Sequence, residues 1–238
     1  MRTWELCVLG IALAFAGGAR ADLPGSLSDV AAAAAPKGPA NSAMVDGLRE
    51  MLKVGTENAI QEVGRADGYL GNPDIRIGLP PALEGTGGKL RTLKLGALVD
   101  DLETSMNRAA EKAAAEAQPV FQVAIEKLSF GEAAQIMGGS ERAATEFFVR
   151  TTRDDLAKTF RPIVEKSIED VGLAKVYDAF VKPIKSIPFM STPQVDLTEH
   201  VTQQALDGLF EMLGREETKM RKDPAARSTP LLQGLFGS

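Results

Sequence analysis

Apolar residues recur every three or four positions along most of this chain, which is the period of an amphipathic helix. The strongest apolar stripes predict helices over about residues 42–63, 97–118, 140–170, 173–184 and 197–222. Strict alternation of apolar and polar residues, which is typical of half-buried strands, is almost absent. The pattern therefore predicts an all-α fold, a single multi-helix, bundle-like domain with no internal repeat.

Local signals mark several of the predicted helix ends. Asp196 followed by Glu199 is a variant of the capping box, which opens a helix. Pro119 is expected in the first turn of a further short helix, where proline is favoured. Pro162 lies inside the third predicted helix, so we expect a kink or a break near Arg161.

Two Gly/Pro-rich loops interrupt the helical pattern, one at residues 65–88 and one at residues 183–193. The first is too rich in these residues for a long helix, and Pro80 and Pro81 confine any strand at 75–77 to a sheet edge. Both loops hold more apolar side chains than loops need. They either fold over the bundle ends as additional core or form the mouth of a site for a hydrophobic ligand or partner. The candidate binding residues are Tyr69, Leu70, Asn72, Ile75, Ile77, Ile187, Phe189 and Met190.

The first 21 residues have the layout of a secretory signal peptide. A weakly positive start precedes an apolar run at residues 6–16 and an A-x-A pattern formed by Ala19 and Ala21, so cleavage is expected after Ala21. The alternative is a membrane anchor, but the run is about a dozen residues long and a span needs about 20. Cys7 lies near the start of the run, which disfavours a lipoprotein. We therefore expect export to the periplasm, with no transmembrane anchor after cleavage.

Cleavage would change the composition of the working protein. The 238-residue chain would lose 21 residues and keep 217, with residues 22–41 as a flexible N-terminal arm and residues 42–238 as the helical domain. The formal net charge of -5 would become -6, because two arginines and one glutamate are lost. The only cysteine, Cys7, and the only tryptophan, Trp4, belong to the discarded segment.

This composition excludes several kinds of chemistry. One cysteine cannot form an internal disulfide or a cysteine-cluster zinc site, and one histidine cannot supply a two-histidine metal centre. An acidic chain has no sequence-wide attraction for nucleic acid. No EF-hand or dinucleotide-binding pattern occurs, so we expect no metal and no cofactor.

The remaining candidate chemistry is one pair of side chains and several acidic doublets. Asp196 and His200 are four residues apart and share a helix face, which suits a carboxylate that orients a general base. No nucleophile motif accompanies them, and such pairs are more often surface pairs near a helix start. We assign no catalytic residue. Adjacent carboxylates, whose side chains point in different directions on a helix, occur at 100–101, 154–155, 169–170 and 216–217.

Several stretches share a recognisable order and spacing: GYLGNPDIRIGLP at 68–80, MNRAAE at 106–111, GGSERAATEFFVRTT at 138–152, LAKTFRPIV at 156–164, VTQQALDGLFEML at 201–213 and KDP at 222–224. Together, over about residues 44–236, they resemble the bacterial family of domains of unknown function numbered 4197. Gly78 stands where many members have proline. The resemblance implies an exported envelope protein of a Gram-negative bacterium. It implies no activity, cofactor or catalytic residue.

The sequence supports three hypotheses about function. The first is a non-enzymatic periplasmic protein that binds an apolar ligand or an envelope partner through the two loops. The second is a carboxylate-dependent hydrolase, with Asp196 and His200 as candidates, and it requires three or more acids to converge in one pocket. The third is a structural or assembly protein of the cell envelope. The lack of convergent catalytic motifs favours the first.

Overall fold

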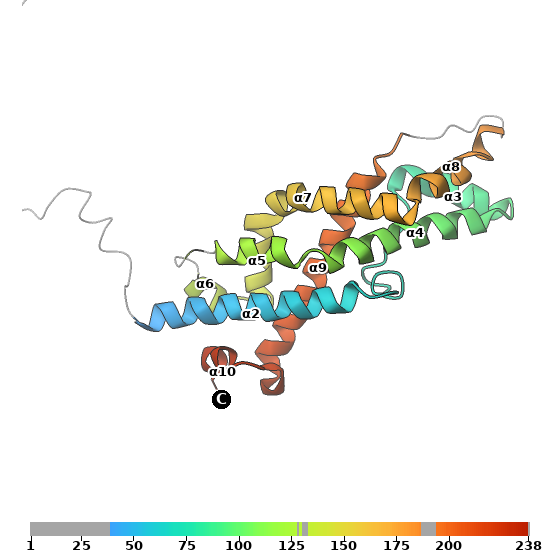
Figure 1. Cartoon of the computed structure of the whole chain (residues 1–238). Coiled ribbons are helices and arrows are strands. Elements are labelled where there is room, and N and C mark those ends of the chain that lie inside the picture. The colour runs from blue at the N-terminus through green and yellow to red at the C-terminus, as the bar shows by residue number, and fades with distance from the viewer. Residues whose placement is uncertain (1–38, 128, 130–132, 187–193, 238) are drawn as a thin grey trace, which may run out of the picture. The chain divides into compact units, whose positions relative to one another are not determined.

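Helices are the regular elements of the computed structural model, which describes residues 39–127, 129, 133–186 and 194–237 (Figure 1). No strand occurs in this part of the chain, so the prediction of an all-α fold is confirmed. None of these helices is long and apolar enough to cross a membrane. The predicted signal peptide, with Ala19 and Ala21, lies outside the described residues. The α-helices are α2 (Pro39–Val63), α3 (Pro81–Thr92), α4 (Gly96–Ala115), α5 (Gln118–Glu126), α6 (Ala133–Met137), α7 (Ala143–Val171), α8 (Leu173–Val181), α9 (Leu197–Lys222) and α10 (Pro230–Phe236), with 3-10 turns at Ile184–Ser186 and Pro224–Ala226.

Helix α9 is the element on which the other long helices converge. It packs against α2, α4 and α7, and Figure 1 shows it running across all three. Three rings from different helices, Phe121 of α5, Phe148 of α7 and Phe210 of α9, contact one another with centroids 5.7–6.3 Å apart. Full burial of a side chain of this size contributes roughly 1.5–3 kcal/mol, so this cluster fixes α5 to the core.

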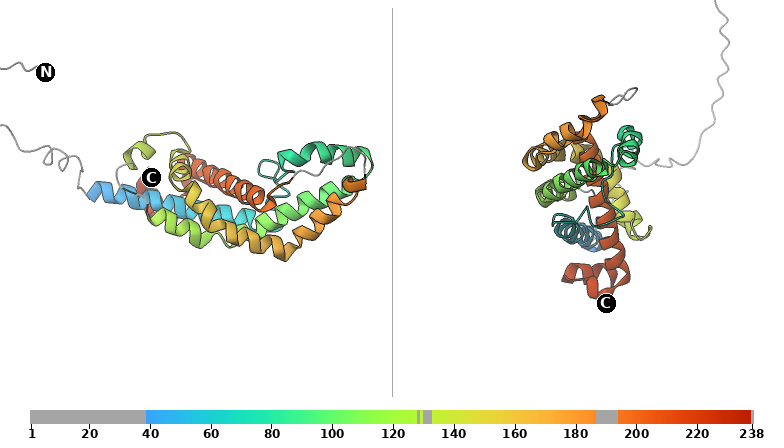
Figure 2. Two further views of the ribbon diagram at one scale, coloured as in Figure 1. Left: turned by 90° about the horizontal axis from the view of Figure 1, so that it is seen from above. Right: turned by 90° about the vertical axis from the view of Figure 1, so that its right-hand side faces the viewer.

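The C-terminal helix α10 lies beside α2 (Figure 2). Its Leu232 is fully buried, whereas Leu231 is 46% exposed. At Gly47 of α2, an added Cβ would come within 3.0 Å of Leu235, so a glycine there permits the close approach of the two helices.

Most helix ends follow the local signals. Helix α2 begins three residues before the predicted start at Ser42 and ends at Val63 as predicted. Pro119 lies in the first turn of α5. The side chain of Asp196 accepts the backbone N–H of Glu199 at 2.9 Å, which confirms the predicted cap of α9.

Pro162 does not divide α7, so of the two expected outcomes near Arg161, a kink or a break, the break does not occur. The missing N–H removes one backbone hydrogen bond of the helix. Phe160 and Val164, on either side of the proline, are fully buried. Packing of these side chains against the core therefore outweighs the local defect.

The first Gly/Pro-rich segment contains a helix that we did not predict. Helix α3 covers Pro81–Thr92 although it includes Gly85, Gly87 and Gly88. Leu83 and Leu90 of this helix are fully buried, and their burial outweighs the low helix propensity of glycine. The alternation at residues 75–77 does not form a strand either.

Candidate functional site

The first predicted binding loop folds into the protein. Tyr69 and Ile77 are fully buried and Ile75 is 7% exposed, while Leu70 and Asn72 are half-buried. Of the two interpretations of this loop, burial supports additional core. A binding role for these five residues stays a prediction, and their burial favours the core interpretation over it.

Tyr69 shows why the loop turns inward. Its hydroxyl donates a hydrogen bond to the backbone carbonyl of Ala205 in α9 at 2.5 Å. Its ring lies against Gly208, where an added Cβ would come within 2.4 Å of a ring carbon. Burial, followed by the charges of Glu111 and Asp207, raises the pKa of the phenol, so the hydroxyl stays a neutral donor.

Two polar side chains of α4 hold the backbone of the same loop. The carboxylate of Glu111 accepts the backbone N–H groups of Tyr69 and Leu70 at 3.2 Å each. The buried amide of Asn107 accepts the N–H of Ile77 at 2.9 Å and donates to its carbonyl at 2.7 Å, as the backbone of a neighbouring strand would. These bonds satisfy loop groups that would otherwise be buried without partners.

The second predicted binding loop is described only at its ends. Ile187, Phe189 and Met190 lie outside the described residues, and their binding role stays a prediction. Ile184, just before them, is fully buried. A hollow of about 600 Å³, lined in part by Gln194 and Val195, lies where α7, α8 and the start of α9 meet.

The Asp196 and His200 pair is not arranged for general base catalysis. One oxygen of Asp196 caps Glu199 and the other accepts from Arg161 at 2.9 Å, and these two contacts lower the pKa of the carboxyl. The Nε2 atom of His200 lies 3.0 Å from the carbonyl of Gly78, to which it must donate because a carbonyl only accepts. Asp196 therefore supports the helix start, which agrees with the interpretation of a surface pair and not with a carboxylate that orients His200.

The acids named for a hydrolase do not converge. Asp100 pairs with Arg91 and Asp170 pairs with Lys112, on separate helices. In the part of the chain that the structure describes, no three His, Cys, Asp or Glu side chains are grouped closely enough to hold a metal ion. The convergence that the hydrolase hypothesis requires is thus not found among these residues.

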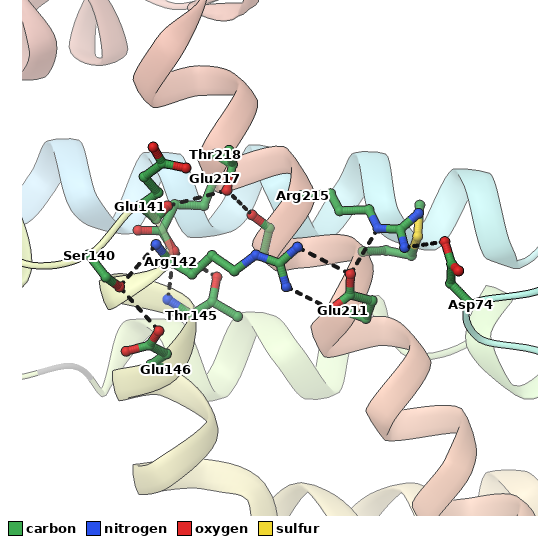
Figure 3. Close-up of polar contacts among 12 residues, drawn as sticks. Asp74, Ser140, Glu141, Arg142, Thr145, Glu146, Glu211, Arg215, Glu217 and Thr218 are labelled. Atoms are coloured by element: carbon green, nitrogen blue, oxygen red, sulfur yellow. Dashed lines mark hydrogen bonds and ion pairs between the residues drawn. The ribbon is translucent and has the colours of Figure 1, made fainter.

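A buried carboxylate of α9 caps α7 from outside that helix. Glu217, which is 1% exposed, accepts the backbone N–H groups of Ala144 and Thr145 at 3.0 and 2.8 Å and the hydroxyl of Thr145 at 2.7 Å (Figure 3). Arg142, in the cap position of α7, forms no side-chain cap of its own. Because the first N–H groups of a helix have no partner within it, a carboxylate there is stabilising. Arg221 balances the charge with a hydrogen bond of 2.9 Å.

A chain of ion pairs lies beside this cap along α9 (Figure 3). Arg142 makes a two-point contact with Glu211 at 2.7 and 3.1 Å. Arg215 bonds to the same carboxylate at 2.9 Å and reaches Asp74 of the first loop at 2.7 Å. The hydrogen bond from Arg142, together with that from Arg215, lowers the pKa of the Glu211 carboxyl. Each charge is paired, so we interpret the network as a clamp between the loop, α7 and α9.

An apolar groove between α5 and α7 is a surface feature that we did not predict from the sequence. We call it the α5–α7 groove. It encloses about 520 Å³ and is lined by twelve described residues. The buried side chains of Phe147 and Leu156 form its floor. Val123, on its α5 wall, is 52% exposed. The lining residues are Pro119, Val120, Val123, Ala124, Lys127, Ser129, Phe147, Thr151, Thr152, Asp155, Leu156 and Thr159.

Helix α5 carries two apolar faces. Phe121 and Ile125 point into the core and are 1% and 4% exposed. Val120, Val123 and Ala124 line the groove instead. A surface helix normally has one apolar stripe and a polar opposite face. The second stripe is visible in the sequence as apolar residues at i, i+3 and i+4, and that signal identifies the groove wall.

Most polar side chains on the walls of the groove already have partners within the protein. Asp155 is paired with Lys158 at 3.2 Å. Lys127, at the C-terminal end of α5, pairs with no carboxylate in the described part of the chain. Three threonine hydroxyls bond to backbone carbonyls one turn earlier at 2.6–2.9 Å, those of Thr151, Thr152 and Thr159.

The family model described as "Protein of unknown function (DUF4197)" matches residues 38–237. The chain belongs to this family. None of the curated proteins and none of the solved structures compared with the chain matches it. The DUF4197 match extends over all the helices from α2 to α10, so the groove and the ion-pair network both lie within it.

The stretches that carry the DUF4197 resemblance meet in the tertiary structure. The segment 68–80 is held by Glu111 of the segment 106–111. The segments 138–152 and 201–213 are joined by the contact between Arg142 and Glu211. These contacts connect four of the six stretches across the fold.

Proposed function

We propose that this protein is exported to the periplasm and binds an apolar ligand there in the α5–α7 groove, without being an enzyme. The observation that carries the proposal is the exposed second apolar face of α5, with Val123 beside Val120 and Ala124. Apolar surface that is exposed together and backed by a second helix is typical of a ligand or partner site.

The groove combines a volume that suits a ligand with an exposed apolar side chain on its wall. Its volume of about 520 Å³ falls within the range of roughly 300–1,000 Å³ that small-molecule sites occupy. Leu231 is also exposed, but it lines a hollow of about 280 Å³ between α2 and α10. None of the large apolar side chains with such exposure lines the hollow at the start of α9.

An apolar fluorescent probe tests the binding proposal. N-phenyl-1-naphthylamine is titrated into the purified protein and into two variants, Val123→Gln and Leu93→Gln. Val123 and Leu93 are both 52% exposed, but Leu93 lies at the end of α3, outside the groove. Loss of a half-exposed aliphatic contact of about 1 kcal/mol predicts about fivefold weaker probe binding for Val123→Gln. Leu93→Gln is expected to bind like the parent, and equal effects of the two variants would contradict the proposal.

The export proposal rests on the order of charged, apolar and small residues at the start of the chain. Expression in a Gram-negative host is expected to place the protein in the periplasmic fraction, with a mature chain that begins at Asp22. Mass spectrometry of the purified protein reads this mass directly. Ala21→Arg is expected to leave an uncleaved precursor, and an uncleaved parent chain in the cytosolic fraction would refute export.

A further inference from the structure

The α5–α7 groove combines an apolar lining with one lysine at its edge. We infer that it takes a single acyl chain that ends in a carboxylate, which Lys127 holds. This inference rests on the proposed function, because it names the class of ligand for the same groove. Three properties of the groove carry it: its length, its charge and its size.

The length of the groove matches one acyl chain. Its lining follows α7 from Phe147 to Thr159, and a helix rises about 1.5 Å per residue, so these residues cover about 18 Å of helix. One leaflet of a bilayer's hydrocarbon core, which an acyl chain spans, is about 15 Å thick. The apolar lining over this length comes from Val120, Val123 and Leu156 among others.

The charge at one end of the groove favours an anionic head group. Lys127 is exposed and ends the α5 wall, beside Ser129, and it pairs with no described carboxylate. Arg150 lies 5.4 Å from the ring centroid of Phe147 and likewise pairs with no described carboxylate. The carboxylate that lines the groove, Asp155, already pairs with Lys158. One lysine and one serine hydroxyl suit a single carboxylate.

The size of the groove separates this occupant from a protein partner. A stable protein interface takes about 20–30 residues from each side. The groove presents twelve described residues. Five of them are threonines, serines or lysines, and one is an aspartate. An acyl chain needs only this narrow apolar lining.

Displacement of N-phenyl-1-naphthylamine by two chain-matched competitors tests the inference. Dodecanoate and dodecan-1-ol have the same chain and differ in the charge of the head. The full protein is expected to bind dodecanoate about threefold to fivefold more tightly, the fold-change of an exposed ion pair. Lys127→Gln is expected to abolish this preference, because it weakens the binding of dodecanoate and leaves the binding of dodecan-1-ol unchanged. Lys53→Gln, which removes an exposed lysine of α2, is the matched control and is expected to keep the preference.

The outcomes separate this inference from the proposed function. Equal binding of the two competitors, or a preference that survives Lys127→Gln, overturns the carboxylate head and leaves the apolar groove intact. Stronger displacement by dodecyl phosphate than by dodecanoate overturns it as well. If Val123→Gln weakens probe binding while neither competitor displaces the probe, the acyl-chain inference is overturned. That result points to another occupant, such as a partner helix. If Val123→Gln does not weaken the probe, the proposed function itself fails. A lysine at a helix C-terminus also stabilises the helix, so the unfolding of each variant is measured separately.

Discussion

Helix α7 borders two regions of this protein that are built in opposite ways. At its start, the buried carboxylate of Glu217 is satisfied by four hydrogen bonds, three from the first turn of α7 and one from Arg221. Further along, where α7 faces α5, Val123 stays 52% exposed above an apolar groove. The first region leaves no described charge without a partner, and the second leaves apolar surface uncovered.

The difference between these regions separates structural residues from candidate functional ones. Clusters of acids and arginines with shifted pKa values often mark active sites. Along α9 each of these charges faces a partner of opposite sign, as Glu211 faces Arg142 and Arg215, so the cluster holds helices together. In the groove, by contrast, Val123 is exposed among the described residues, which is why we propose a ligand there. Four predictions test this contrast, from the largest expected effect to the smallest.

The two faces of α5 are expected to respond very differently to truncation. Phe121→Ala removes a side chain that is 1% exposed and should reduce the free energy of unfolding by about 3–5 kcal/mol. Val123→Ser removes a half-exposed side chain and should reduce it by less than about 1 kcal/mol. Urea unfolding followed by circular dichroism measures both. Similar losses would mean that Val123 belongs to the core and that the groove is not open.

The cap of α7 is expected to be the most sensitive polar position. Glu217→Gln removes a buried charge and leaves Arg221 without a carboxylate partner, so we expect a loss of about 3 kcal/mol in urea unfolding. Asp154→Asn removes an exposed carboxylate from the same helix α7 and should change stability by less than about 0.5 kcal/mol. A Glu217→Gln protein as stable as the parent would show that the network does not hold α7 to α9.

Two glycines are expected to respond to alanine with opposite signs. Gly208→Ala places a Cβ within 2.4 Å of the Tyr69 ring and should destabilise the protein by about 1–3 kcal/mol. Gly85→Ala in α3 meets no atom within 4 Å and should stabilise it by about 0.5–1 kcal/mol, the helix preference of alanine over glycine. Thermal unfolding gives both signs. If Gly208→Ala left the thermal stability unchanged, the close packing of the Tyr69 ring against Gly208 would be contradicted.

Acid is expected to remove the contribution of the Glu211 ion pairs. Because the pKa of this carboxyl is lower in the folded chain than in the unfolded chain, the pairs stabilise the fold above the unfolded value, near 4.3. That stability is lost as the pH falls through the lower folded pKa. Glu211→Gln should therefore be about 0.5–1 kcal/mol less stable than the parent at pH 7. The difference should shrink below about pH 4, and a difference that persists at low pH would contradict the charge-based account.

Local patterns in the sequence predicted much of this fold correctly. The long stripes of α2, α4 and α9 and the cap at Asp196 depend on residues a few positions apart, which the sequence displays directly. Helix α3 was missed because its glycines disfavour a helix locally, while the buried Leu83 and Leu90 stabilise it through contacts outside the segment. Continuity of α7 through Pro162 has the same cause.

The candidate site was harder to predict than the fold. We predicted the apolar residues of the 68–80 loop as candidate ligand contacts. Tyr69, however, is fully buried, and its hydroxyl donates to a backbone carbonyl 136 residues away in the sequence. The groove was missed for the opposite reason, since the apolar residues of α5 look like ordinary core residues. Only the placement of α7 shows that one face of α5 is covered and the other is open.

The sequence by itself determined that this is an all-helical chain of the DUF4197 family, because helical period and motif order are properties of neighbouring residues. Tertiary structure alone decided which apolar faces are covered and which charges are paired. Glu217 and Thr145, for example, are 72 residues apart and become cap and helix start only when α9 lies across α7. Burial and pairing are properties of the neighbours in space, and those neighbours are chosen by the packing of the whole domain.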